Sequence, residues 1–137
     1  MTKMPLTKHD ESLVQATTDL IKKKFIKNQH HVACILETEK GIYASLHLDT
    51  YGFDICAEPI AISNALADGA ADFRTLVAVY WNGDKAIEPV VVSPCGDCRQ
   101  TLLQYTPGIK VVLLDNSTNA LTAEYIEDLL PYAYKKL

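Results

Sequence analysis

Two short cysteine motifs place the strongest constraint on how this chain can fold. The first is Cys56-Ala57-Glu58, and the second is the Cys-x-x-Cys pair Cys95 and Cys98. Each motif stands where a strand or loop is expected to pass into a helix, and the spacing of the pair puts both thiols on one side of a first helical turn. Free N–H groups and the positive end of a helix dipole favour thiolate there. The sequence therefore predicts that two helix starts meet and bring three thiolates together.

Three thiolates in one place make a Zn²⁺ site with one position left open. An open position is typical of a catalytic zinc, whereas a structural zinc takes a fourth protein ligand, and no fitting fourth is obvious in the sequence. Glu58 is close enough to Cys56 to reach a water molecule in that position and to move its proton. The alternatives are a structural zinc, cysteines of the core, or a plain helix N-terminal carboxylate for Glu58. Cys34 stands alone in a predicted strand and is expected to be a small buried side chain.

Composition and charge narrow the class of protein. The 137 residues are 48% hydrophobic and 22% charged, which is typical of a single globular domain spanning residues 1–137. A formal net charge of -4 gives no positive field for nucleic acid, and no apolar run is long enough to span a membrane. The first residues lack the apolar segment of a secretory leader, so the cytoplasm is the expected location. Cysteines there are expected to serve metal binding or catalysis rather than disulfides.

Hydrophobic periodicity and turn signals predict alternating helices and strands. The expected helices lie at 13–25, 57–68, 98–105 and 122–130. The expected strands lie at 31–38, 42–49, 75–81, 90–92 and 109–114. This order predicts an α/β fold in which a mixed sheet is covered by helices.

Both cysteine motifs resemble those of the cytidine deaminase superfamily, in its group of nucleoside-type cytidine deaminases and blasticidin S deaminases. The resemblance rests on Ile55-Cys-Ala-Glu58 and on Ser93-Pro-Cys-Gly-Asp-Cys-Arg-Gln100, and the order of elements extends it over nearly the whole chain. It implies a three-layer α-β-α fold with helices on both faces of a mixed sheet of about five strands. It also implies one Zn²⁺ per subunit and a homotetramer or, alternatively, a homodimer. The implied activity is hydrolytic deamination of an aminopyrimidine nucleoside such as cytidine or deoxycytidine, with Glu58 as the proton carrier.

The resemblance also implies which residues hold the substrate. The backbone N–H of Ala57 is expected to meet the pyrimidine O2, and main-chain carbonyls at Ser93 and Pro94 are expected to receive the departing amine. Cytidine deaminases bind ribose through an Asn-x-Glu on the second strand, and His47 and Asp49 fall on those positions here. His47 and Asp49 are therefore expected to bind the polar part of the substrate. The alternative is that both lie on a solvent face.

Some positions depart from the family pattern. A shorter loop after the second strand allows the Asn-x-Glu to align instead with 45–47. An aromatic residue that stacks on the base in cytidine deaminases is replaced by His30 or His31. Pro59 stands where an arginine often offsets the thiolate charge, so Arg99 is expected to supply that compensation.

These departures keep other functions open. The missing Asn-x-Glu favours, as an alternative substrate, a modified nucleoside antibiotic such as blasticidin S or another small amino-heterocycle. A polynucleotide deaminase is disfavoured, because such enzymes usually have His where this chain has Cys56 and need a basic groove. A different class, a non-catalytic zinc protein used for binding or assembly, would have no need of Glu58.

Overall fold

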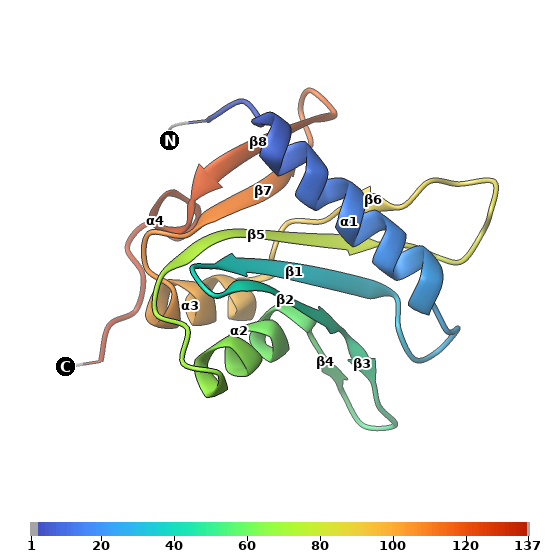
Figure 1. Ribbon diagram of the computed structural model, residues 1–137, viewed down its shortest axis with the longest axis horizontal. Helices are drawn as coiled ribbons and strands as arrows, with labels where there is room; N and C mark the ends of the chain where they lie inside the picture. The colour runs from blue at the N-terminus through green and yellow to red at the C-terminus, as the bar shows by residue number, and fades with distance from the viewer. Residues whose placement is uncertain (1–2, 137) are drawn as a thin grey trace.

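The structure, a computed structural model, describes residues 3–136 (Figure 1), and residues 1–2 and 137 of the predicted domain lie outside the described part. Its middle layer is a mixed sheet. The strands of this sheet are β1 (Val32–Thr38), β2 (Gly41–Leu46), β5 (Phe73–Tyr80), β6 (Val90–Val91), β7 (Lys110–Asp115) and β8 (Ala120–Tyr125). They lie in the order β2-β1-β5-β7-β8, with β6 paired to β5. Strands β5 and β7 run parallel, and the other neighbours run antiparallel.

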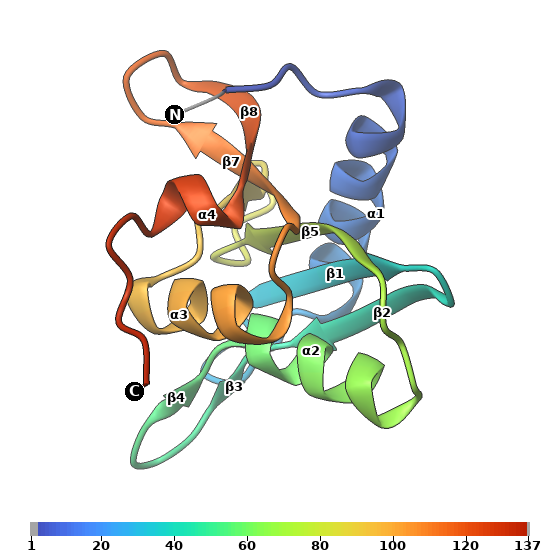
Figure 2. The same ribbon diagram turned by 90° about the vertical axis from the view of Figure 1, so that its left-hand side faces the viewer.

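Helices cover both faces of this sheet. The helices are α1 (Lys8–Lys24), α2 (Ala57–Ala67), α3 (Gly96–Tyr105) and the short α4 (Ile126–Leu129). Helix α1 lies on one face, and α2 and α3 lie side by side on the other, with α4 next to α3 (Figure 2). The predicted three-layer α/β fold is therefore confirmed. Within residues 3–136, no helix combines the length and the apolar character that crossing a bilayer requires.

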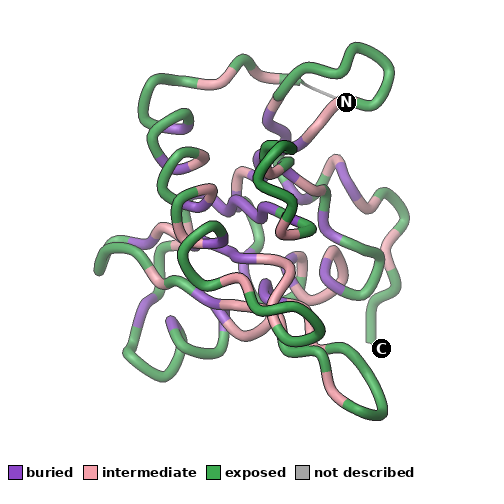
Figure 3. Tube along the Cα trace, turned by 90° about the vertical axis from the view of Figure 1, so that its right-hand side faces the viewer, coloured by how far each residue is buried: buried purple, intermediate pink, exposed green. Residues whose placement is uncertain are grey.

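Alternating side chains of the strands supply both interfaces between layers. Leu36 of β1 and Leu76 of β5 are buried in one apolar cluster with residues of α2 and α3. Their sequence neighbours Ile35 and Val77 are buried in a second cluster, with residues of α1. The buried segments consequently run through the middle of the molecule, as Figure 3 shows in purple.

The predicted helix at 122–130 is wrong over its first half. Its residues up to Tyr125 belong to β8, and only α4 is helical. A turn ending at Asn119, which has a positive φ of 57°, brings the chain back beside β7, and β8 pairs with β7 along its whole length. Met4 pairs with Ala123 from the other side. Hydrogen bonds to two neighbouring segments thus outweigh the helical pattern of this stretch.

The predicted strand at 42–49 is interrupted at His47. Strand β2 ends at Leu46, and the chain continues as β3 (Leu48–Asp49), which pairs with β4 (Asp54–Ile55) in a separate two-stranded ribbon. The short loop that the sequence predicts after the second strand is therefore part of this β3–β4 hairpin. It leaves the main sheet beside the start of α2 (Figure 1), so it stands next to the first cysteine motif.

A buried ion pair joins α1 to the sheet. Asp10, only 1% exposed, forms a capping box with Thr7 and accepts a hydrogen bond of 2.9 Å from Lys110 Nζ of β7. Burial acts to raise the Asp10 pKa, but the bonds from Lys110 and Thr7 outweigh it and hold the pKa below its ordinary value. The stability that this carboxylate adds is therefore present above pH about 4 and is lost as the pH falls.

We expect Lys110→Ala to lower the free energy of unfolding by about 3–5 kcal/mol, because it leaves a buried carboxylate without its partner. Lys3→Ala is the matched control, since Lys3 pairs with Asp115 at the exposed end of the same strand and should cost at most about 1 kcal/mol. Urea denaturation of both variants measures the difference. Equal losses of unfolding free energy in the two variants would show that the buried ion pair stabilises the protein no more than the exposed one.

Candidate metal centre and active-site cavity

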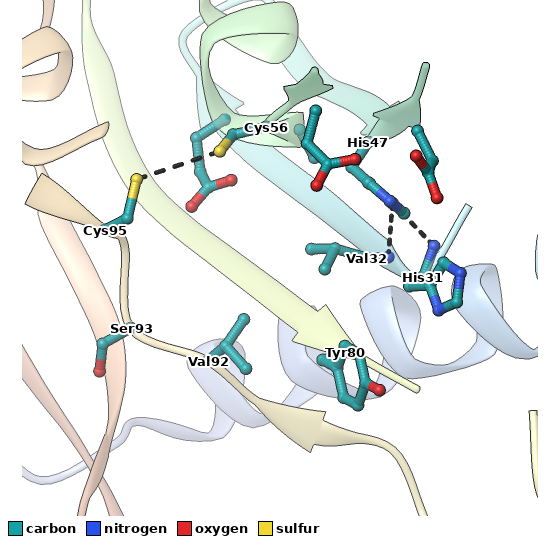
Figure 4. Close-up of a pocket in the computed structure, with 12 residues that line it drawn as sticks. His31, Val32, His47, Cys56, Tyr80, Val92, Ser93 and Cys95 are labelled. Carbon is teal, nitrogen blue, oxygen red and sulfur yellow. Dashed lines mark hydrogen bonds between the residues drawn. The ribbon is translucent and has the colours of Figure 1, made fainter. Parts of the chain in front are cut away.

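The structure brings the three predicted thiols together at the starts of two helices. Cys56 is the N-cap residue of α2, Cys95 is the N-cap residue of α3, and Cys98 lies in the first turn of α3. The Sγ atoms of Cys56 and Cys95 are 4.0 Å apart, and those of Cys95 and Cys98 are 3.3 Å apart. Figure 4 shows Cys56 and Cys95 facing each other across the gap between their helices. All three sulfur atoms lie within 4.8 Å of one another.

This cluster fits a zinc ion in both donor type and spacing. Four ligands at about 2.3 Å around a tetrahedral zinc place sulfur atoms about 3.8 Å apart, and the observed 4.0 and 3.3 Å lie on either side of that value. In the described part of the chain, no fourth His, Cys, Asp or Glu joins the group. The cluster can therefore hold one zinc ion with three protein ligands and one position open to the cavity.

Burial acts against the thiolate preference that the sequence predicts for helix starts. It raises the pKa of the Cys98 thiol well above the ordinary value, with the Glu58 charge adding to the effect. Burial also raises the pKa of the Cys56 thiol. A divalent cation favours the deprotonated form strongly enough to reverse this balance, so metal binding must release protons from these thiols.

Glu58 places a carboxyl group at the inner end of the same cavity. It is the second residue of α2, is 5% exposed, and lines the cavity together with Cys56 and Cys95. Burial raises its pKa above the ordinary value of a glutamate. A buried carboxyl of raised pKa can accept and return a proton at a pH closer to neutrality than a free carboxyl can.

The cavity has a volume of about 450 Å³ and extends from the thiols to the start of β1 and the β3–β4 hairpin. Its lining residues are His31, Val32, His47, Asp49, Asp54, Cys56, Ala57, Glu58, Tyr80, Val92, Ser93 and Cys95. Of the substrate residues that the sequence suggests, His47, Asp49, Ala57 and Ser93 are in this set. Pro94 is buried and is not in this set.

His47 is held in one tautomer by backbone groups at the start of β1. Its Nδ1 accepts hydrogen bonds from the backbone N–H of His31 at 2.7 Å and of Val32 at 3.1 Å (Figure 4). The neutral ring must then carry its proton on Nε2, which leaves Nε2–H as a donor. Burial, followed by the charge of His31, lowers the His47 pKa. His47 therefore stays neutral and keeps this donor over a wider pH range than a free histidine.

The two neighbouring histidines differ in position. His31 lines the cavity and stacks on Tyr80, with ring centroids 6.4 Å apart. His30 is not among the lining residues, and its Nδ1 donates to the carbonyl of His47 at 2.9 Å, which supports the irregular backbone there. Ser45, the other residue in the alternative alignment, is buried and donates to the carbonyl of Ala57 at 2.6 Å. It therefore holds the start of α2 rather than facing the cavity.

Arg99 does not line the cavity and is bonded to backbone carbonyls instead. Its Nε donates to the carbonyl of Pro94 at 2.9 Å, and its Nη1 donates to the carbonyl of Leu129 at 3.0 Å. These bonds tie the segment before α3 to α4 and keep a positive charge beside the loop that carries Cys95.

Two notable lining residues are missing from the sequence-based set, Asp54 and Tyr80. Asp54 stands two positions before Cys56, so its proximity to the first motif is a signal that the sequence does offer. Tyr80 enters the cavity only because β5 lies beside β1 in the sheet, with Tyr80 opposite Val32. No local pattern in the sequence indicates that contact.

Comparison with known proteins gives consistent matches over most of the chain. Residues 7–114 match the model of the cytidine and deoxycytidylate deaminase zinc-binding region. A blasticidin-S deaminase of Bacillus cereus is 35% identical over 138 residues, which cover 96% of this chain and 96% of that protein. A cytidine deaminase of Sporosarcina psychrophila is 31% identical over 106 residues, which cover 76% of this chain and 74% of that protein.

Solved structures agree on the fold. The cytidine deaminase from Bacillus anthracis superposes with a TM-score of 0.75 at 23% identity, covering 90% of this chain and 88% of its own. The cytidine deaminase from Mycobacterium tuberculosis superposes with a TM-score of 0.68 at 20% identity, covering 93% of this chain and 98% of its own. At such identities the likeness shows a shared three-layer architecture.

We expect Cys98→Ser to abolish stable zinc binding, because two thiolates and a hydroxyl hold zinc far less well than three thiolates. Cys34→Ala is the matched control, since Cys34 is fully buried in the core cluster and lies outside the group of three thiols. Metal content after purification and dialysis, measured by mass spectrometry, should fall close to zero for Cys98→Ser and stay near one zinc per chain for Cys34→Ala. Equal zinc in both variants would rule out the cluster as the metal site.

Proposed function

Because the chain belongs to the family defined by the cytidine and deoxycytidylate deaminase zinc-binding region, we propose that it is a hydrolytic deaminase of an aminopyrimidine nucleoside. In this proposal cytidine or deoxycytidine becomes uridine or deoxyuridine, and ammonia is released. The observation that carries it is the buried carboxyl of Glu58, which lines the same cavity as the thiols of Cys56 and Cys95. A zinc site that served only binding or assembly would have no need of that carboxyl.

Glu58 carries the protons in this reaction. A zinc ion held by Cys56, Cys95 and Cys98 supplies Lewis-acid chemistry, which makes a water molecule acidic enough to lose a proton near neutral pH. Glu58 accepts that proton and delivers it to ring N3, and it later takes the second proton of the water, now on the hydroxyl at C4, and gives it to the amino group. The water oxygen forms its bond to C4, the C4–N bond breaks, and the amino nitrogen leaves as ammonia. The raised pKa of Glu58 suits a group that both accepts and returns a proton.

Backbone groups at the two helix starts orient the base. Ala57 is the first residue of α2, so its N–H has no partner within the helix and is free to meet the pyrimidine O2. The carbonyl of Pro94 already accepts a bond from Arg99. Ser93 lines the cavity, and its carbonyl is therefore the better placed of the two to receive the departing amine.

Arg99 compensates charge at the metal cluster in this proposal. Three thiolates and one Zn²⁺ leave a net negative charge, which would make the bound water less acidic. The guanidinium of Arg99 is fixed by the carbonyls of Pro94 and Leu129 beside the cluster. The N-termini of α2 and α3 add the positive ends of two helix dipoles.

The outer part of the cavity binds the polar part of the substrate. His47 offers Nε2–H as a donor, and Asp49 offers a carboxylate as an acceptor from the neighbouring strand β3. A sugar hydroxyl can use both, because it accepts one hydrogen bond and donates another. His47 and Asp49 would thus replace the Asn-x-Glu of the cytidine deaminases.

A second candidate substrate is a modified nucleoside antibiotic of the blasticidin S type. A blasticidin-S deaminase is 35% identical to this chain over 96% of both proteins. The chain also lacks the ribose-binding Asn-x-Glu and carries His47 and Asp49 instead. The reaction at C4 would be the same, and only the group held by the outer part of the cavity would differ.

We also propose that the active form is a homotetramer, with a homodimer as the alternative. Tyr51, Phe53, Tyr132 and Tyr134 are between 68 and 113% exposed, and aromatic side chains of this kind are typical of surfaces that pack against a partner. Light scattering of the purified protein would give the mass of the oligomer.

Location in the cytoplasm and a role in pyrimidine salvage stay predictions.

The first test measures ammonia release from cytidine, deoxycytidine, cytosine and blasticidin S by the zinc-loaded protein. We expect Glu58→Gln to keep its zinc and to lose at least about 1000-fold in kcat, because the amide cannot carry the proton. Glu88→Gln is the matched control, since Glu88 lies in an exposed loop, where it pairs with Lys22.

Each outcome of that panel has a distinct meaning. Turnover of the nucleosides supports the salvage-type substrate, and turnover of blasticidin S alone supports the second candidate. Full activity of Glu58→Gln would overturn the role of the carboxyl. Silence of the wild type on all four compounds would favour a non-catalytic zinc protein.

A second test concerns His47. We expect His47→Asn to raise KM about fivefold with zinc content unchanged, because a hydrogen bond to the substrate worth about 1 kcal/mol is lost or misplaced. His9→Asn is the control, since His9 is an exposed residue of α1 that pairs with Glu37 away from the cavity. An unaltered KM in His47→Asn would place the substrate elsewhere.

A further inference from the structure

Gly83, in the loop between β5 and β6, leaves room for an aromatic ring that any other residue would displace. A Cβ at this position would lie 2.6 Å from Cζ of Phe25, far inside van der Waals contact. The φ of Gly83 is +86°, which is also a conformation that glycine adopts without strain. Phe25 is the half-buried C-cap residue of α1. One side of its ring therefore rests directly on the backbone of the loop.

Hydrogen bonds fix the loop that carries Gly83. The indole Nε1 of Trp81 donates to the carbonyls of Asp84 at 3.2 Å and Ile87 at 2.8 Å. Asn82 Oδ1 accepts a bond of 2.9 Å from the backbone N–H of Asp84, which closes the turn around the glycine. Trp81 is itself only 8% exposed and belongs to the apolar cluster under α1. The loop is therefore tied to the core and gives Phe25 a fixed support.

Phe25 packs edge-to-face against two further rings. Its ring centroid lies 5.4 Å from that of Trp81, with an interplanar angle of 67°, and 5.3 Å from that of His31, with an angle of 78°. Aromatic pairs favour arrangements of this kind. A ring displaced from Gly83 must either push on these neighbours or lose contact with them. In both cases His31 loses its present support.

His31 connects this packing to the cavity, which it lines together with His47. Its backbone N–H donates to His47 Nδ1 at 2.7 Å, and the two rings meet edge-to-face with centroids 5.3 Å apart (Figure 4). The ring of His31 is oriented by the backbone N–H of Asn28, which donates to Nε2 at 3.2 Å. The carbonyl of His31 accepts a bond of 2.9 Å from the backbone N–H of Trp81. A shift of His31 would consequently change both of its contacts with His47.

We propose that Phe25, fixed by Gly83, is a positioning residue that holds His31 in place and through His31 orients the Nε2–H donor of His47. Phe25 is not among the described residues that line the cavity, so it acts on the substrate only through the histidines. This role rests on the proposed deaminase function, in which His47 binds the polar part of the substrate. It extends the residues that determine substrate affinity to a loop outside the cavity.

The first arm of the experiment compares Gly83→Ala with Gly69→Ala. The φ of Gly69 is +85°, but a Cβ there would meet only Lys40 Nζ at 3.7 Å, which is an ordinary contact. The two variants thus carry the same backbone strain, and only Gly83→Ala displaces Phe25. We expect Gly83→Ala to raise KM about fivefold for whichever of the four test compounds the wild type turns over, with kcat changed by less than about twofold. Gly69→Ala should leave KM at the wild-type value, and an equal rise in both variants would overturn the role of Phe25.

The second arm removes the ring without a clash, through Phe25→Leu. Phe73→Leu is its control, because Phe73 is also half-buried but packs against the cluster on the other face of the sheet, outside the cavity. Two-bond proton–nitrogen NMR of histidine-labelled, zinc-loaded protein reports the tautomer of His47, and His47→Asn assigns its signal. We expect Phe25→Leu to move this signal from the Nε2–H form toward an average of the two tautomers. Phe73→Leu should leave the signal unchanged, because it removes packing without touching the histidines.

The two arms separate failure of this inference from failure of the deaminase proposal. A wild-type His47 signal in Phe25→Leu overturns the positioning role even where the protein is an active deaminase. If none of the four compounds releases ammonia, the deaminase proposal fails. The NMR comparison then still decides the role of Phe25, because it needs no turnover. A changed signal in Phe25→Leu alone supports that role, and equal signals in Phe25→Leu and Phe73→Leu overturn it.

Discussion

The meeting of two helix starts is the constraint on which the rest of the structure depends. Cys56 and Cys95 each cap a helix, so their thiols come together only if α2 and α3 lie side by side on one face of the sheet. The sheet provides that face through apolar residues such as Leu36 and Leu76, and Ser45 fixes the first turn of α2 through the carbonyl of Ala57. Helix α1 covers the opposite face and is locked by the buried Asp10–Lys110 pair. Much of the fold thus supports the relative position of the two cysteine motifs at the starts of α2 and α3.

Local sequence signals predict the helices and strands that carry the two cysteine motifs. They fail where the pairing of strands determines the structure. Pro59, tolerated only in a first turn, predicts the start of α2 at Cys56, where the structure has it. The buried strands β1, β5 and β7 are predicted from their apolar runs. The stretch 122–130 reads as a helix, because its pattern contains no information about the turn that pairs it with β7. The break at His47 is equally hidden, since the hydrogen bonds that accompany it come from the backbone N–H groups of His31 and Val32, which lie far from His47 in the sequence.

The residues of the site also divide into those that local motifs predict and those that strand pairing brings together. The residues at its chemical end are visible in the sequence, because Cys56, Glu58, Cys95 and Cys98 occupy fixed places in two first turns. The residues at its outer end are assembled from strand pairing: Tyr80 comes from β5, and Asp54 comes from a hairpin that the sequence indicates only as a loop. The tautomer of His47 depends on β1 and could not be read from any motif.

The two ends of the cavity depend on different parts of the fold, so membership of the family leaves the substrate open. The inner end groups three thiols at two helix N-termini, with the guanidinium of Arg99 bonded to the neighbouring carbonyl of Pro94, and this arrangement suits a cation. The outer end lies on a small ribbon that contributes little to the core, since Asp49 and Asp54 are both exposed. Residues there can change without disturbing the packing of α2 and α3. A shared inner end therefore fits relatives named for cytidine and for blasticidin S alike.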